Sequence, residues 1–236
     1  MSKKILQKGV FMTEKPLAIV TGGSNGNLGP LWVNWLHEAG YRTWIIDKPT
    51  YDISQKEDVK FALDRCLAIF GAPQLVVNNA AIDNPPGTNA SFFGNIEKIL
   101  AVNIIGVVNM VEIFSPVMLA QGGGNIVNIG SMLGFISSNP ELYPENFDKP
   151  CAYGMSKAAI WNFTNNCNVR YAIQGLISTM LALSAVEGNQ SEDFKEKYKK
   201  KIPIRRLLKP GDFKNEFLTC CKAKVPYDAP LFVGGG

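Results

Sequence analysis

Histidine and cysteine are scarce in this chain of 236 residues, which has one histidine, His37, and five cysteines without a Cys-x-x-Cys spacing. A zinc site needs several closely spaced Cys and His ligands, and a disulfide framework needs a dense set of cysteines in a short secreted chain. The sequence therefore predicts no metal site and no disulfide scaffold. The cysteines are expected to be structural thiols, because free cysteine usually packs as a small buried hydrophobe.

Long apolar runs are also lacking, and we expect no segment that crosses a bilayer. The N-terminal stretch 1–16 contains Lys8, Glu14 and Lys15, which interrupt it before a signal-peptide core can form. These patterns predict a cytoplasmic protein without a membrane partner.

The remaining composition suits one domain that buries a continuous sheet, since 46% of the residues are hydrophobic and neither repeats nor low-complexity linkers occur. We expect a single domain over residues 1–236, with 1–15 as an N-terminal extension. Strand-like runs alternate with helical patterns, which is typical of an α/β three-layer, doubly wound fold with a mostly parallel sheet of six or seven strands. The predicted strands are 17–21, 43–46, 75–77, 125–129, 176–183 and 231–233, and the main predicted helices are 55–70, 95–119 and 152–173.

A glycine-rich loop follows the first predicted strand. The buried run Leu17–Val20 leads directly into Thr21–Gly29, and an amphipathic segment, Leu31–Ala39, comes next. Glycines between a strand and a helix let the backbone approach a pyrophosphate, which then binds to the free amides at the start of the helix. A flexible glycine turn is the alternative. The loop therefore indicates a dinucleotide site.

An acidic residue ends the second predicted strand, where Thr43–Ile46 is followed by Asp47. A carboxylate at this place accepts hydrogen bonds from the hydroxyls of the adenosine ribose. Asp47 thus favours NAD over NADP, although the neighbouring cation, Lys48, could tolerate a 2′-phosphate.

Tyr153 and Lys157 lie four residues apart in a predicted helix, so their side chains share one face. A phenol beside an ammonium can transfer a proton near neutral pH if the positive charge stabilises the phenolate. The same spacing also arises by chance on solvated helices.

Several motifs in the same order and approximate spacing resemble the short-chain dehydrogenases/reductases. They are Thr21-Gly22 with Gly26 and Gly29, Asp52-Ile53, Asn78-Asn79-Ala80-Ala81, Asn103, Ser131, and Tyr153 with Lys157. The resemblance covers nearly the whole chain and implies a compact Rossmann fold. Within the family, 78–86 and 188–190 are similar to members linked to bacterial surface-polysaccharide and sugar biosynthesis.

The resemblance implies a role for each matching residue. Tyr153 would exchange a proton with the substrate, Lys157 would hold the nicotinamide ribose and lower the pKa of Tyr153, Ser131 would orient the reacting oxygen, and Asn103 would hold a water. Asn78 would brace neighbouring strands. The implied cofactor-binding residues are Gly22, Ser24, Asn25, Gly26, Asn27, Leu28, Asp47, Asp52, Ile53, Asn79, Ala80 and Ala81, with Tyr153 and Lys157.

Simpler structural roles stay open for some of these residues. Ser131 could end a strand, Asn103 could be a buried amide satisfied by backbone, and Asp52 could cap the helix that starts near Gln55. The chain also departs from the family pattern. Leu28 occupies the place of the third glycine, as if one residue were inserted before Gly29. The Pro-Gly that the family has after the strand matching 176–183 is replaced within 183–188, and the C-terminal part after 212 is short.

A basic run, Lys195–Lys201 with Arg205 and Arg206, carries much of the excess that makes the net charge +4. It could bind nucleic acid, but the resemblance implies that 186–210 covers the substrate, so a solvated helix is favoured and no nucleic-acid partner is expected. Cations that faced the substrate would favour an anionic one, such as a sugar acid or a nucleotide sugar.

Together these patterns predict an oxidoreductase that transfers a hydride between NAD and the carbonyl or secondary alcohol of a small molecule. The sugar-linked motifs point to a sugar or sugar-acid derivative. A catalytically impaired dinucleotide sensor and a methyltransferase-like domain are the alternatives, but neither needs Tyr153 and Lys157 together. Helices 95–119 and 152–173 are apolar on more than one side, which predicts a homodimer or homotetramer.

Overall fold

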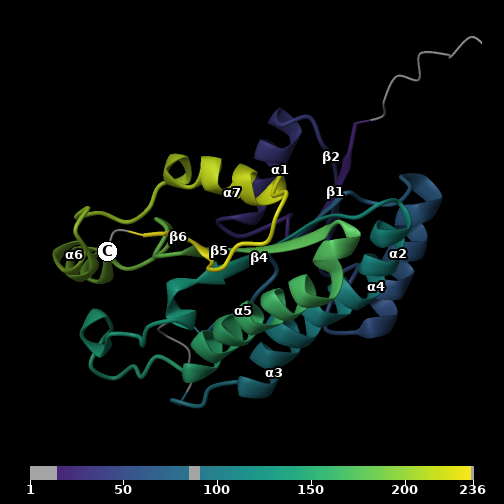
Figure 1. Cartoon of the computed structure of the whole chain (residues 1–236). Helices are drawn as coiled ribbons and strands as arrows, with labels where there is room; N and C mark the ends of the chain where they lie inside the picture. The colour runs from purple at the N-terminus through teal and green to yellow at the C-terminus, as the bar shows by residue number, and fades with distance from the viewer. Residues whose placement is uncertain (1–14, 85–90, 235–236) are drawn as a thin grey trace, which may run out of the picture.

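The computed structural model describes residues 15–84 and 91–234, and in this part of the chain six strands form one parallel sheet (Figure 1). The strand order is β2-β1-β3-β4-β5-β6. The strands are β1 (Leu17–Thr21), β2 (Arg42–Ile46), β3 (Leu75–Asn78), β4 (Gly124–Ser131), β5 (Leu176–Leu183) and β6 (Leu231–Val233). The prediction of a doubly wound α/β fold with a mostly parallel sheet of six or seven strands is confirmed, with six strands in the described residues, and the predicted strand limits agree to within two residues.

Helices cover both faces of the sheet (Figure 1). The helices α1 and α7 pack on one face, and α2, α4 and α5 pack on the other. The bounds are α1 (Gly29–Glu38), α2 (Lys56–Ile69), α3 (Ile96–Leu100), α4 (Val107–Ala120), α5 (Cys151–Tyr171), α6 (Glu192–Lys201) and α7 (Lys214–Cys221).

An aromatic cluster fills the layer between the sheet and the pair α1 and α7. Trp32 and Trp35 of α1 lie against Phe213 and Phe217, and the rings of Trp32 and Phe217 stack with centroids 4.3 Å apart. These side chains pack on β1, whose residues are all buried, as expected of an inner strand of a parallel sheet. The cluster anchors the start of α1, which follows the glycine loop.

The opposite layer contains the longest helical stretch, which runs from Ile96 to Ala120. Its α3 and α4 parts are joined by a π-helical turn, Ala101–Gly106. By length and composition this stretch could cross a membrane, so the expectation that no segment is long enough is wrong. However, 61% of its most apolar part is buried inside the fold, where Met110, Phe114 and Met118 pack under the sheet.

Buried amides connect the central strands. Asn78 Nδ2 donates to Asn128 Oδ1 at 2.8 Å, and Asn128 Nδ2 donates to Thr164 Oγ1 at 2.9 Å, which links β3, β4 and α5. This bond is the brace between neighbouring strands that the resemblance implied for Asn78. It holds the carboxyl ends of β3 and β4, on which the site depends, at a constant separation.

The order of the strands reverses its direction between β1 and β3, because the chain leaves β1 toward β2 and returns to β3 on the other side. In doubly wound sheets a ligand binds outside the carboxyl ends of the strands at this switch point, where the two loops diverge. The loop after β1 contains Gly22–Gly29, and the segment after β3 contains Asn79–Asp83. The fold therefore positions the predicted dinucleotide motifs at one crevice.

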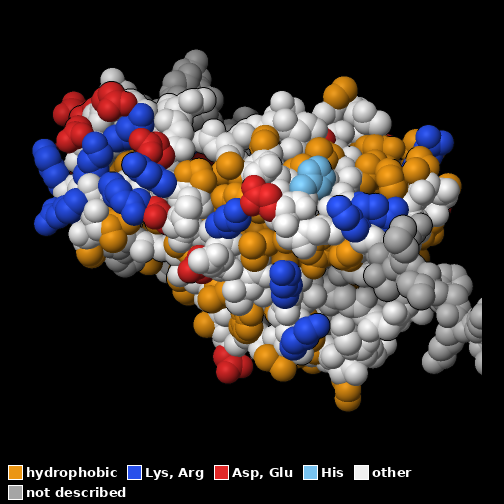
Figure 2. Space-filling view, turned by 90° about the horizontal axis from the view of Figure 1, so that it is seen from above, with side chains coloured by type: hydrophobic (Ala, Val, Ile, Leu, Met, Phe, Trp, Pro, Cys, Tyr) orange, Lys and Arg blue, Asp and Glu red, His pale blue; other side chains and the backbone are white. Residues whose placement is uncertain are grey.

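The solvated helix expected around Lys195–Lys201 is α6. Its aromatic face packs on the loop that precedes α5, with Phe194 5.7 Å from Tyr143 between ring centroids. Its charged face mixes both signs (Figure 2), because Lys195, Lys197 and Lys199 pair with acidic residues of the same helix. The lysines are therefore compensated locally.

The cysteines fit their predicted structural role. All five are free, and Cys66, Cys167, Cys220 and Cys221 are buried. Burial raises the pKa of the Cys66 and Cys167 thiols to about 11, which keeps them protonated and unreactive near neutral pH.

Candidate active site

A cavity of about 530 Å³ lies at the carboxyl edge of the sheet, at the switch point. Every cofactor-binding residue predicted from the sequence lines it except Ser24, whose backbone N–H donates to Asp47 Oδ2 at 3.2 Å. Residues that the sequence reasoning did not assign to the cofactor also line it: Gly29, Ile46, Lys48, Tyr51, Ile82, Asp83, Lys98, Val102, Ile129 and Gly130. Some of these could have been found, because Ile82 and Asp83 directly follow the Asn78–Ala81 motif. Tyr51 and Lys98 belong to no motif.

The glycine loop is packed too tightly for larger residues at two places. Gly22 has φ of +62°, and a Cβ there would lie 2.9 Å from Ala80 Cα. A Cβ on Gly29 would lie 2.1 Å from the carbonyl oxygen of Gly22. Gly29 is therefore a position at which the start of α1 packs too closely on the loop for any side chain. Asn27 of this loop lies against Gly188, where a Cβ would lie 2.1 Å from Asn27 Nδ2.

No side chain caps the backbone amides at the start of α1, where Pro30 itself carries no N–H. The residue before the helix, Leu28, makes no side-chain capping bond, and the first turn contains no acidic residue. Unpaired amides at a helix start attract anions. Because Gly26, Asn27 and Leu28 line the cavity beside this turn, the site fits a pyrophosphate.

Asn79 fastens the loop after β1 to the segment after β3. Its Nδ2 donates to the carbonyl oxygens of Thr21 and Gly22 at 3.0 and 2.9 Å, and its Oδ1 accepts from Trp32 Nε1 at 2.8 Å. These bonds engage both the donor and the acceptor end of the Asn79 side-chain amide. Asn79 thus lines the cavity but acts on its shape, by holding the glycine loop in place.

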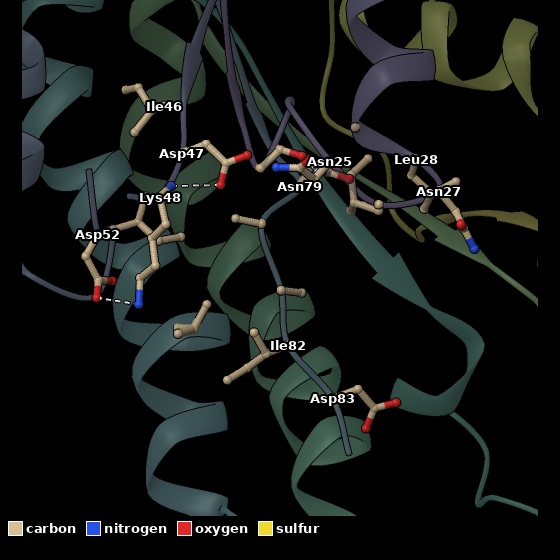
Figure 3. Close-up of a pocket in the computed structure, with 18 of the residues that line it drawn as sticks. Asn25, Asn27, Leu28, Ile46, Asp47, Lys48, Asp52, Asn79, Ile82 and Asp83 are labelled. Atoms are coloured by element: carbon tan, nitrogen blue, oxygen red, sulfur yellow. Dashed lines mark hydrogen bonds and ion pairs between the residues drawn. The ribbon is translucent and has the colours of Figure 1, made fainter. Parts of the chain in front are cut away.

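The carboxylate of Asp47 lies between the glycine loop and the cation beside it (Figure 3). Its Oδ1 accepts from the backbone N–H of Lys48 at 2.9 Å, while Lys48 Nζ turns away and pairs with Asp52 Oδ2 at 2.7 Å. Asp52 also accepts from Ser54 N and Oγ through Oδ1, and Gln55, not Asp52, precedes α2 as its N-cap residue. Lys48 is therefore partly neutralised where a 2′-phosphate would need it.

The proton-transfer residues meet at the other end of the cavity. Tyr153 and Lys157 project from α5, with Lys157 Nζ 5.6 Å from the centroid of the Tyr153 ring. Ser131 ends β4, and its hydroxyl, which accepts from Leu133 N at 3.2 Å, acts on Tyr153 by lowering the pKa of the phenol. Lys157 Nζ donates to the Ile129 carbonyl at 2.7 Å, which keeps the ammonium beside β4. The structure thus brings together three residues that are up to 26 positions apart in sequence.

Two glycines allow this approach. The short turn Met132–Gly134 follows Ser131, and a Cβ on Gly134 would lie 2.9 Å from Ala158 N. A Cβ on Gly154 would lie 2.7 Å from the Leu133 carbonyl oxygen. Larger residues would separate this turn from α5 and move Ser131 away from the phenol.

Burial dominates the electrostatics of Tyr153 and Lys157. Burial, together with the charge of Asp83, raises the pKa of Tyr153 to about 12, and the hydroxyl of Ser131 opposes the rise. Burial lowers the pKa of Lys157 to about 8, against the opposing charge of Asp83. Tyr153 is therefore a protonated acid near neutral pH. The lowering of its pKa that Lys157 and a nicotinamide ring are expected to cause starts from this raised value.

Asn103 lies in the π-helical turn, a geometry that often marks functional sites. Its Oδ1 accepts from Ile82 N at 2.8 Å, and its Nδ2 donates to the Ile82 carbonyl and to Ser156 Oγ. Ser156 Oγ in turn donates to the Tyr153 carbonyl at 2.7 Å. The side chain is therefore the backbone-satisfied amide of the simpler alternative, and it ties the segment after β3 to α5.

Comparisons with known proteins agree with this geometry. A family model described as short chain dehydrogenase matches residues 48–199. The mouse protein "Dehydrogenase/reductase SDR family member 4" (Mus musculus) is 30% identical in an alignment of 199 positions that covers 78% of this chain and 66% of that protein. This chain thus spans about two thirds of the length of that relative.

Solved structures share the fold over almost the whole chain. A short chain dehydrogenase from Leptospira borgpetersenii with bound NAD+ has a TM-score of 0.80 and 22% identity, covering 94% of this chain and 92% of that one. A gluconate 5-dehydrogenase from Burkholderia cenocepacia, in complex with NADP and tartrate, has a TM-score of 0.78 and 20% identity, covering 94% of each chain. At these identities the likeness concerns the architecture only.

Proposed function

Because this chain belongs to the short-chain dehydrogenase/reductase family, we propose that it is an oxidoreductase that interconverts a carbonyl and a secondary alcohol with a nicotinamide cofactor. One observation supports this most directly. Tyr153, Lys157 and Ser131 meet at one end of a cavity whose other end combines the glycine loop, the open start of α1 and Asp47. A site built only to bind a dinucleotide has no need of a buried phenol beside a lysine and a serine.

The residues present suit each part of the reaction. The bound cofactor would supply or accept the hydride. During reduction Tyr153 Oη gives its proton to the carbonyl oxygen, and Ser131 Oγ keeps that oxygen in position. Lys157 holds the ribose end and brings positive charge toward the phenolate that remains. One carbonyl, one hydride and one proton give one alcohol, so no metal or covalent nucleophile is required.

Turnover with a panel of ketones tests this proposal. Purified protein with NADH or NADPH should oxidise the cofactor only when a carbonyl compound is added, measured by loss of nicotinamide absorbance. Binding of NADH without turnover on any carbonyl compound would favour the dinucleotide sensor. Binding of S-adenosylmethionine alone would favour the methyltransferase-like alternative.

We further propose that the cofactor is NAD rather than NADP, since the carboxylate of Asp47 accepts ribose hydroxyls and repels a 2′-phosphate. The variant Asp47→Ala should weaken NADH binding by about tenfold, the equivalent of one or two hydrogen bonds, and should weaken NADPH binding less. Binding isotherms for the two cofactors measure this difference.

The matched control is Asp64→Ala, which removes an exposed carboxylate on α2 that does not line the cavity. It should leave both affinities unchanged. Equal losses for NADH and NADPH in Asp47→Ala would remove Asp47 as the selector.

We propose a hydroxylated, sugar-like carbonyl compound as the substrate, because 78–86 and 188–190 are similar to sugar-linked members of the family.

We also propose that the protein forms a homodimer or homotetramer. The outer faces of the long helices leave Ile105, Met155, Val169 and Ile173 about half to almost fully exposed, which suits a contact between copies.

A further inference from the structure

An ion pair outside the family motifs lies beside the proton-transfer residues. Lys149 Nζ contacts Asp83 Oδ2, and it joins the segment after β3 to the residue that precedes Pro150 and α5. The Lys149 side chain is only 8% exposed, whereas that of Asp83 is 33% exposed. The cation is therefore buried and the carboxylate remains open on one side.

The open side of this pair faces the reacting end of the cavity. Asp83 lines the cavity together with Tyr153, and Lys149 Nζ lies 5.4 Å from the centroid of the Tyr153 ring. In Figure 3 Asp83 is far from Asp47 and Lys48, across the length of the site. The pair thus belongs to the place where the substrate reacts, and the adenosine end lies opposite.

The carboxylate of Asp83 has acceptor capacity left. Oδ1 accepts the backbone N–H of Asn84 at 2.7 Å, and Oδ2 accepts from Lys149. A carboxylate offers about four acceptor sites, so sites remain toward the cavity. A substrate that covers this oxygen must supply a donor, because an unpaired buried carboxylate is costly, and a second anion there would be repelled.

We propose that Asp83, held in place by Lys149, determines the specificity of the enzyme by accepting a hydrogen bond from a hydroxyl group beside the reacting carbon. The preferred substrate is then a neutral hydroxycarbonyl compound or vicinal diol, and carboxylates at this place are rejected. This inference rests on the proposed function, which it extends to a substrate class.

The basic helix α6 does not oppose this assignment. Lys195, Lys197 and Lys199 pair with acids of the same helix, and Lys201 contacts Glu141. Because these ammonium groups are already paired at the surface, they are poor candidates for recognition of an anionic substrate. The carboxylate of Asp83 lines the cavity and acts on the charge state of Tyr153, whose pKa it raises.

If the ion pair of Asp83 and Lys149 only tethered the segment after β3 to α5, its loss would lower kcat/KM for all substrates alike. The test therefore compares substrates. Hydroxyacetone and 2-butanone differ by a hydroxyl in place of a methyl group, and pyruvate places a carboxylate beside the ketone. With NADH, the kcat/KM of the wild type should favour hydroxyacetone over 2-butanone by at least about tenfold and should be lowest for pyruvate.

Two variants and a control complete the experiment. Asp83→Ala should bring the ratio of hydroxyacetone to 2-butanone close to one, because kcat/KM falls much further for hydroxyacetone than for 2-butanone. Asp83→Asn, which keeps the shape and removes the charge, should raise turnover of pyruvate. Asp148→Ala removes an exposed carboxylate one residue from Lys149 and should keep the wild-type ratios.

A ratio that survives in Asp83→Ala, or an equal loss on both ketones, overturns the assignment. If no ketone is reduced at all, calorimetric binding of hydroxyacetone and 2-butanone to the NADH-loaded protein measures the same discrimination. A loss of that discrimination in Asp83→Ala would support the assignment even though hydride transfer had failed, so the two failures can be told apart.

Discussion

Replacing Tyr153 by phenylalanine is expected to lower kcat by about 10³-fold, within the range typical of a lost general acid, while the Kd for NADH changes little. The phenol is buried against Ser131 and Lys157, and burial with the nearby Asp83 raises its pKa to about 12. Tyr153 is therefore a proton donor that remains protonated at neutral pH. Phenylalanine keeps the ring and its packing, so only the chemical step loses a group. Steady-state kinetics and NADH titration separate the two effects.

Tyr171→Phe is the matched control, because it removes a phenol from the last residue of the same helix, away from the cavity. It should behave like the wild type.

The raised pKa of Tyr153 also predicts how the rates of the wild-type enzyme change with pH. Oxidation of an alcohol needs the deprotonated phenol, so its rate should rise with pH, whereas reduction should not gain from higher pH. A Tyr153→Phe variant with undiminished kcat would refute the role given to this residue.

The second large effect is expected for Gly29→Ala. A methyl group there would lie 2.1 Å from the Gly22 carbonyl oxygen, a distance that no real contact allows. Either the start of α1 or the loop after β1 must move, and overpacking of this kind costs roughly 1–3 kcal/mol. Both movements displace the amides that would hold a pyrophosphate. We expect a lower midpoint of thermal unfolding and an NADH Kd raised by at least about tenfold, because positioned backbone donors would be lost.

Gly211→Ala provides the control, since a Cβ at Gly211 meets no atom within 4 Å. It should change neither the unfolding midpoint by more than a degree or two nor the affinity for NADH. Both variants replace a glycine by alanine, so a difference between them reflects the surroundings of the glycine. If Gly29→Ala binds NADH as tightly as the wild type, the role of Gly29 in shaping the loop is wrong.

The strands were predictable because the inner ones are continuous apolar runs that end in glycine or polar residues. Leu17–Thr21 and Leu176–Leu183 match their predicted limits, since both are buried along their whole length and nothing competes with the strand pattern. The stretch 95–119 was predicted as one helix, and it is divided by the π-helical turn. That turn accompanies the bonds of Asn103 to Ile82, which no local pattern encodes.

The sequence also predicted which residue types line the site, but not how their atoms are used. Asn79 and Asn103 were assigned to the cofactor and to a water, and in the structure their side-chain amides bind the backbone of neighbouring segments. An amide can donate and accept in either role, so only its surroundings decide between them.

By itself the sequence determined the layered fold, the glycine loop and the pairing of Tyr153 with Lys157, because strand burial, turn chemistry and helical spacing are local properties of the chain. Only the tertiary structure decided that Ser131 reaches the phenol, that Gly29 closes the loop, and that Asp83 and Lys149 stand beside the reacting groups. Those contacts join residues 7 to 66 positions apart, and their energies depend on burial and distance, which arise when the sheet and its helices pack together.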